Sequence, residues 1–349
     1  MFILLLQPAV FAQSNSAGSP ISSAPQAEQP LPKDAGALLA LAGQVNGLGA
    51  PGLKPWHMKA SYETFDPQGK SSGQGTFEVF WSGPKKYKQT ISSDAFWQTQ
   101  YGTESGIYRT GNLYSLPYPQ AYLIDQVLHP MPNQDDINEA RPERREQAFG
   151  AVHLQCVMLS QKIEGAAALP LGLFPTYCFS PAKPILRYST YGGGVGIVFN
   201  QFVLFQGRYF AKQITVKDKN GPIISIQVDQ IGGLETVEDA VFTPPADAVK
   251  ARDALSEVPG DVMKGNLVTK VPPIYPPSAK FTRTSGTVLL QVLIGKDGHI
   301  HGLRILQSPD PALTVAALEA VQQWVYQPYL LNGEPVDVLT KVTVNFRIG

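Results

Sequence analysis

The C-terminal segment 275–348 carries the feature that most constrains the fold: apolar and polar side chains alternate along stretches that turn residues separate. Residues 286–294 and 300–307 have the two-residue period of β-strands, and Asp297-Gly298 between them predicts a hairpin turn. Residues 336–348 alternate in the same way over a longer run, with one apolar and one polar face. The pattern predicts a small antiparallel sheet that is buried on one side.

A helix is predicted between the second and third of these strands. Asp310 followed by Pro311 is typical of a helix start, because the carboxylate accepts from free N–H groups and Pro fits the first helical position. The expected order is ββαβ, a small α+β unit. Apolar residues recur at helical spacing and predict a face against the sheet: Leu313, Ala317, Ala320, Val321 and Trp324.

This segment resembles the C-terminal domain of the TonB energy-transducer family, over residues 265–349. The features that carry the resemblance occur in order: Tyr275-Pro276, Gly286-x-Val288, Asp297-Gly298, Ser308, Ala316-Ala317, Trp324-x-Tyr326-x-Pro328 and Gly333. The resemblance implies that the C-terminal strand engages the TonB box, a peptide of outer-membrane TonB-dependent receptors. The implied contact residues are Val338, Thr340, Lys341, Val342, Thr343, Val344, Asn345 and Phe346.

The physical basis for such a contact is an open sheet edge. No segment is expected to cover the last strand, and an unpaired edge can add an extended peptide through main-chain hydrogen bonds. Two alternatives remain open. Lys341 and Arg347 could blunt the edge, or a second copy of the chain could close it in a homodimer.

The first residues predict export from the cytoplasm. An apolar run that ends near Ala12 is too short to span a bilayer, which needs ~20 residues, so residues 1–12 are interpreted as a signal peptide. Residues 13–33, rich in Ser, Pro and Ala, are expected to be a flexible linker. The basic residues usual before such a run are missing, which leaves an alternative: the true start lies upstream of Met1 and supplies an inner-membrane anchor.

Charge and cysteine usage restrict the class of protein. The formal net charge is +0, so the sequence lacks the excess of basic residues that is typical of proteins that bind nucleic acid or anionic membranes. In an exported protein Cys156 and Cys178 are expected to pair, and closing their loop contributes about 3 kcal/mol. Free thiols are the alternative, since no neighbouring residues suit a metal pair or a nucleophile.

The region 34–249 is expected to be a β-rich domain, and 250–264 a linker to the C-terminal domain, 265–349. Alternating runs between residues 56 and 113, and again between 152 and 234, are typical of an antiparallel meander. The pattern indicates a curved sheet or half-barrel with helices in its mouth. Helices are predicted at 37–48, 118–128 and 135–149, the last with a charged, solvated face.

The order of these elements resembles that of LolA/LolB-like periplasmic proteins, which handle lipoproteins or lipids. The resemblance implies an apolar pocket for an acyl chain on the concave face of the sheet. The alternative is that the same aromatic side chains fill an ordinary core.

No catalytic constellation is found, so neither enzymatic activity nor a cofactor or metal is expected. His299 and His301 lie two residues apart on one strand face and could both reach one metal ion. Two ligands without a third make a poor site, however.

The sequence therefore predicts a TonB-like protein of the periplasm or cell envelope that docks on a receptor by β-strand addition, in energy-coupled transmembrane transport. If a membrane anchor is present, the resemblance adds proton-motive-force complex proteins as partners; without one, the protein binds without pulling. The alternative is a periplasmic lipid or lipoprotein carrier whose middle domain binds apolar cargo.

Overall fold

The computed structural model describes residues 30–112, 116, 118–161, 163, 169–190, 195–218, 220–251 and 255–348. The expected signal peptide and residues 13–29 of the expected linker lie outside them. Two units are distinguished, residues 1–30 and 31–349, and every element described below belongs to the second. Among the described helices, none combines the length and the apolar content needed to cross a bilayer.

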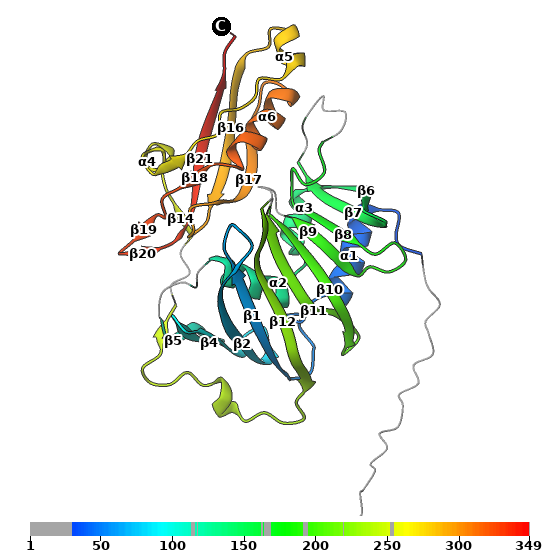
Figure 1. The fold of residues 1–349 in the computed structure, drawn as a ribbon, viewed down its shortest axis with the longest axis vertical. Helices are drawn as coiled ribbons and strands as arrows, with labels where there is room; N and C mark the ends of the chain where they lie inside the picture. Colours follow the sequence, from blue (N-terminus) through cyan, green and yellow to red (C-terminus); the bar gives the residue numbers. More distant parts are fainter. Residues whose placement is uncertain are drawn as a thin grey trace, which may run out of the picture. The chain divides into compact units, whose positions relative to one another are not determined.

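A large, open and curved antiparallel sheet occupies the first part of the described chain (Figure 1). Its described strands follow the order β13-β5-β4-β3-β2-β1-β12-β11-β10-β9-β8-β7-β6. The bounds are β1 Trp56–Phe65, β2 Ser71–Gly83, β3 Lys86–Ser93, β4 Trp97–Thr103, β5 Gly106–Gly111, β6 Arg141–Phe149, β7 Val152–Ser160, β8 Thr176–Phe179, β9 Leu186–Thr190, β10 Gly196–Phe205, β11 Arg208–Asp218, β12 Gly221–Gly233 and β13 Val249–Lys250.

Helices α1 (Ala35–Val45) and α2 (Tyr118–Leu128) pack with the sheet into one core. Helix α1 begins at Asp34, whose carboxylate accepts from the Ala37 N–H at 2.7 Å. Alternate side chains of β1 are buried against these helices, which is the period of a strand with one face in the core. A short 3₁₀ helix, Asp239–Phe242, precedes β13.

The expectation of a helix over 135–149 is wrong for most of that range. Helix α3 spans only Gln134–Glu139, and Arg141–Phe149 forms β6, which pairs with β7 along its whole length. Because β6 is the last strand of the sheet and buries neither face, it lacks the alternation that marks a strand. Its second residue is Pro142, which an edge strand tolerates better than a helix interior does.

A second, four-stranded sheet follows, with the order β14-β21-β16-β17. Strand β14 is parallel to β21, and the other pairs are antiparallel. Two short strand pairs, β15-β18 and β19-β20, accompany it among the described residues. The bounds are β14 Leu255–Glu257, α4 Gly260–Gly265, β15 Leu267–Thr269, α5 Pro277–Phe281, β16 Gly286–Ile294, β17 Ile300–Gln307, α6 Pro311–Val321, β18 Val325–Tyr326, β19 Leu330–Leu331, β20 Glu334–Pro335 and β21 Asp337–Phe346.

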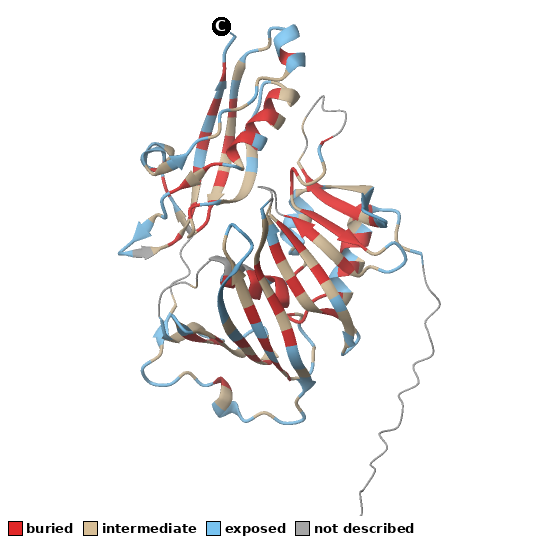
Figure 2. Ribbon diagram, in the orientation of Figure 1, coloured by how far each residue is buried: buried red, intermediate tan, exposed pale blue. Residues whose placement is uncertain are grey.

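Helix α6 covers one face of this sheet. It begins at Asp310, whose carboxylate accepts from the N–H groups of Ala312 and Leu313 at 2.8 and 3.0 Å. Buried side chains alternate with exposed ones along β21, as Figure 2 shows. The apolar side of β16 and β21 therefore packs against α6, and the polar side is open.

The segment between the two sheets is structured where the sequence suggested a plain linker. Residues 250–264 contain β14 and most of α4, and β14 joins the second sheet. The second core also takes side chains that precede β8, among them Leu169, Leu173 and Phe174. The expected domain boundary therefore falls in a region where the chain already contacts the second sheet.

Candidate functional site

Strand β21 pairs with β16 from Val338 opposite Ile294 to Phe346 opposite Gly286. The carbonyl oxygen of Leu339 accepts from the Val258 N–H at 3.0 Å, so Leu339 directs its backbone groups away from β16. These groups alternate between the two sides of a strand, and those of Thr343 and Asn345 consequently point away from β16 as well.

The start of this outer edge is already covered. Leu255, Ser256 and Glu257 of β14 pair with Asp337, Val338 and Leu339. The Thr340 hydroxyl donates to the Val258 carbonyl oxygen at 2.7 Å. The backbone of Gly260 also approaches β21, since a Cβ built on it would lie 2.3 Å from the Lys341 carbonyl oxygen. The edge is thus closed from residue 337 to residue 341.

Residues 342–346 form what we call the open edge. No described strand pairs with its outer side, where the N–H and C=O groups of Thr343 and Asn345 lie. The side chains of these two residues are exposed on the uncovered face of the sheet. The Thr287 hydroxyl donates to Asn345 Oδ1 at 2.8 Å, which holds that side chain against β16.

The structure sorts the eight residues implied to contact a partner into two sets. Lys341, Thr343 and Asn345 are exposed, whereas the side chains of Val338, Thr340, Val342, Val344 and Phe346 are buried in the core. A peptide at this edge would therefore meet the backbone of the strand and the exposed side chains. The sequence pattern does not indicate the cover by β14, because a three-residue strand has no periodicity to detect.

His299 and His301 flank one carboxylate, in the turn between β16 and β17. His299 Nδ1 lies 3.0 Å from Asp297 Oδ2, and His301 Nε2 lies 2.9 Å from Oδ1. Burial by itself raises the pKa of Asp297, but the interactions with both histidines outweigh it and hold that pKa below its usual range. The same carboxylate raises the pKa of His299. Among the described residues, no group of three or more His, Cys, Asp or Glu side chains could hold a metal ion.

The predicted pairing of the two cysteines is confirmed. Cys156 on β7 and Cys178 on β8 lie opposite each other and form a disulfide, and both are fully buried. The bond joins two strands of the 13-stranded sheet, whereas the open edge belongs to the second sheet. We therefore assign the disulfide a role in the stability of the fold.

A small sheet with a helix on one face and an open terminal strand is the kind of unit that can bind an extended peptide by adding it as a further strand. Residues 271–348 match the family described as Gram-negative bacterial TonB protein C-terminal. The matching residues are those for which the sequence implied this resemblance.

One characterised relative is Protein TonB of Vibrio cholerae serotype O1, which is 30% identical over 106 residues. The match covers 30% of this chain and 43% of that protein, so the chain spans less than half of this relative's length.

Two solved structures align with more than half of the chain at low sequence identity. A DUF1329 family protein from Desulfovibrio piger aligns over 62% of this chain and 98% of its own, with 13% identity and a TM-score of 0.40. A LolA superfamily protein from Nitrosomonas europaea aligns over 60% of this chain and 97% of its own, with 11% identity and a TM-score of 0.36. Similarity at this level is too low for us to infer a function from it.

Proposed function

We propose that this chain is a TonB-like protein of the periplasm or cell envelope, which docks on an outer-membrane TonB-dependent receptor in energy-coupled transmembrane transport. The observation that carries the proposal is the open edge of β21, within the segment that matches the TonB C-terminal family. The receptor would supply its TonB box as an extended strand, because main-chain groups are what the edge offers.

The proposed contact is narrower than the full strand. Residues 337–341 already have neighbours in β14 and α4, so the added strand would pair with residues 342–346. Thr343 and Asn345 would exchange main-chain hydrogen bonds with it. The exposed side chain of Thr343 would contribute to the choice of peptide, since side chains next to a paired backbone contact those of the partner strand.

Substitution of Thr343 by Pro tests this docking. Pro removes an N–H that points outward, and the hydrogen bonds between β21 and β16 keep their donors. A fluorescent synthetic peptide with the TonB box of an outer-membrane receptor is expected to bind Thr343→Pro at least about tenfold more weakly than wild type, a loss of about 1.4 kcal/mol. Thr343→Ala keeps the N–H and serves as the matched control, with binding close to wild type. Equal binding of the peptide by Thr343→Pro and by Thr343→Ala would reject docking at this edge.

The alternative of a lipid carrier receives no support from the interior of the large sheet. The cavity beside α2, β10 and β11 has a volume of about 10 Å³, room for roughly one water molecule. Side chains of α1 and α2, such as Leu38, Leu39 and Leu123, fill the space between helices and sheet. Since an acyl chain needs a far larger cavity, we do not advance cargo binding as a function.

A further inference from the structure

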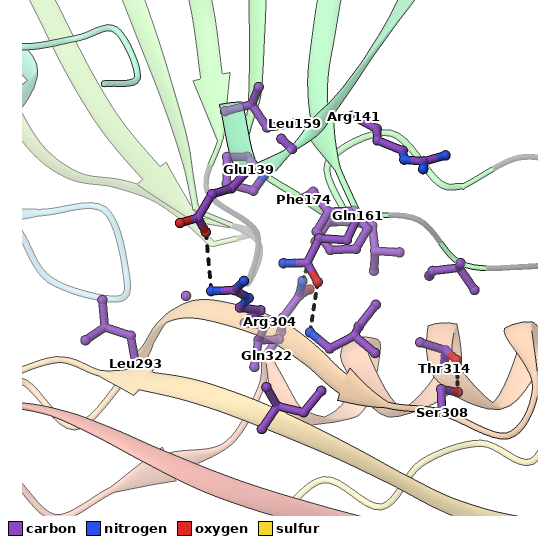
Figure 3. A pocket seen from close by; sticks show the side chains of 18 of the residues that line it. Glu139, Arg141, Leu159, Gln161, Phe174, Leu293, Arg304, Ser308, Thr314 and Gln322 are labelled. Carbon is purple, nitrogen blue, oxygen red and sulfur yellow. Dashed lines mark hydrogen bonds and ion pairs between the residues drawn. The ribbon is translucent and has the colours of Figure 1, made fainter. Parts of the chain in front are cut away.

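A cleft of about 870 Å³ lies along the other edge of the second sheet, at β17 (Figure 3). One wall is β17 and the start of α6, and the opposite wall comes from α3, the end of β7 and the segment before β8. This volume is within the range of sites that hold drug-sized ligands, roughly 300 to 1,000 Å³. No described strand pairs with the outer side of β17, which is the last strand of its sheet.

The backbone of β17 presents hydrogen-bonding groups to this cleft. Lys341 of β21 directs its backbone N–H and C=O groups away from β16. Gln291 lies opposite Lys341 on β16, so the backbone groups of Gln291 point away from β21 and toward β17. Gln291 pairs with Arg304, whose backbone groups therefore point toward β16. By alternation, the N–H and C=O groups of Leu303 and Ile305 point into the cleft.

A side chain from the large sheet already uses one of these groups. The Gln161 carboxamide oxygen accepts from the Ile305 N–H at 2.8 Å, and Figure 3 shows Gln161 reaching toward β17. This contact supports the orientation deduced for Ile305 from the strand register. It also shows that an amide can occupy the position where the next strand would lie. The groups of Leu303 face the remaining space.

Charged side chains of both signs line the α3 side of the cleft, those of Asp136, Glu139 and Arg141. Glu139 lies 3.3 Å from Arg304 and is paired with it, as Figure 3 shows. Asp136 also lines the cleft and has no ion-pair partner among the described residues. Partial burial raises the pKa of Asp136, a hydrogen bond with the Asn133 backbone offsets part of this effect, and the carboxylates of Glu139 and Asp135 add to it. A cation placed next to Asp136 would relieve that repulsion.

Apolar side chains line part of the cleft, including those of Leu159, Leu293 and Leu306. Leu306 is 42% exposed, so an apolar partner side chain placed against it would remove further apolar surface from water. The cleft thus combines a strand edge, apolar contacts and a carboxylate that has no ion-pair partner among the described residues, features that suit an extended peptide.

We propose that this cleft is a second peptide site, where an extended peptide adds as a strand to the outer edge of β17 at Leu303 and places a Lys or Arg side chain beside Asp136. The site is separate from the open edge of β21, because the two strands lie on opposite sides of β16. The chain would thereby hold two extended segments, one at each edge of the same sheet.

Two fluorescent heptapeptides of alternating Val and Thr, one with Lys at both ends and one with Glu at both ends, test the proposal on the full chain by fluorescence anisotropy. The Lys probe is expected to bind at least about tenfold more tightly than the Glu probe. Asp136→Asn should reduce that preference. Leu303→Pro, which removes the N–H in the cleft, should abolish binding of the Lys probe, whereas Leu303→Ala, which loses the same side chain and keeps the N–H, should retain it.

The outcomes separate this site from the edge of β21. Loss of Lys-probe binding in Thr343→Pro, with full binding in Leu303→Pro, would overturn the second site and leave docking at β21 in place. Absence of binding by either probe at millimolar concentration would also overturn it. Equal binding of the Lys and Glu probes would overturn the assignment of a basic partner residue to Asp136.

Discussion

At the scale of single residues, Asp297 holds the hairpin turn of the second sheet. Its carboxylate accepts from the His299 N–H at 3.1 Å and contacts both histidine rings. Gly298 follows with a φ of +79°, and a Cβ built on it would lie 1.9 Å from the Tyr326 carbonyl oxygen. The turn therefore requires glycine, both for its backbone conformation and for the close approach of β18.

The interaction of Asp297 with His299 predicts a pH dependence of stability. The raised pKa of His299 contributes stability that is fully present below its unfolded pKa, about 6.5, and is lost as pH rises through the folded value. The lowered pKa of Asp297 contributes stability above about pH 4, which is lost as pH falls. The wild-type free energy of unfolding should therefore gain up to about 1 kcal/mol at about pH 5.5 relative to about pH 8.5 from this pair.

Urea unfolding of wild type and Asp297→Asn at these two pH values measures that gain. Asparagine keeps the oxygen that accepts from the His299 N–H and removes the charge, so the pH dependence should shrink in the variant. His153→Gln removes a more exposed pair, between His153 and Glu146, and serves as a control that should change less. An unchanged pH dependence in Asp297→Asn would contradict the assignment.

At the scale of elements, strands that bury one face were predictable and strands that bury none were not. The alternation in β1, β16 and β21 reports a buried face, and these strands formed close to where the sequence indicated. Strand β6 lies at a sheet edge and β14 has three residues, so neither carries that signal. The position of the last strand was predictable, but the extent of its open edge was not, because β14 covers the start of that edge.

The pairing of Cys156 with Cys178 was also predictable, because a chain with two cysteines allows a single intramolecular pair. Their separation of 22 residues predicts that the bond contributes about 3 kcal/mol to the free energy of unfolding. Chemical unfolding with and without dithiothreitol should show this loss for wild type. In the double variant Cys156→Ala, Cys178→Ala, dithiothreitol should not change the free energy of unfolding. If dithiothreitol leaves the free energy of unfolding of wild type unchanged as well, the disulfide does not contribute to stability.

At the scale of the whole described chain, side chains from the region of the large sheet contribute to the core of the second sheet, and no local sequence pattern predicts this. Leu173 and Phe174 precede β8 of the large sheet but belong to the core of the second. The Gln322 carboxamide donates to the Leu173 carbonyl oxygen at 2.8 Å, at the end of α6. Contacts between residues so far apart in sequence leave no periodicity, so the composition of this core could not be predicted.

This shared core predicts that a substitution near the large sheet destabilises the second one. Phe174 is 2% exposed, and Phe174→Ala should cost about 3 to 5 kcal/mol and lower the hydrogen-exchange protection of β17 and α6 in particular. Phe77→Ala is the matched control, because Phe77 is 1% exposed and belongs to the core of the large sheet. It should lower protection in β1 and β2 first. Equal protection of β17 and α6 in the Phe174→Ala variant and in wild type would mean that the second sheet is stable without its neighbour, and the cleft at β17 would then lose its fixed opposite wall.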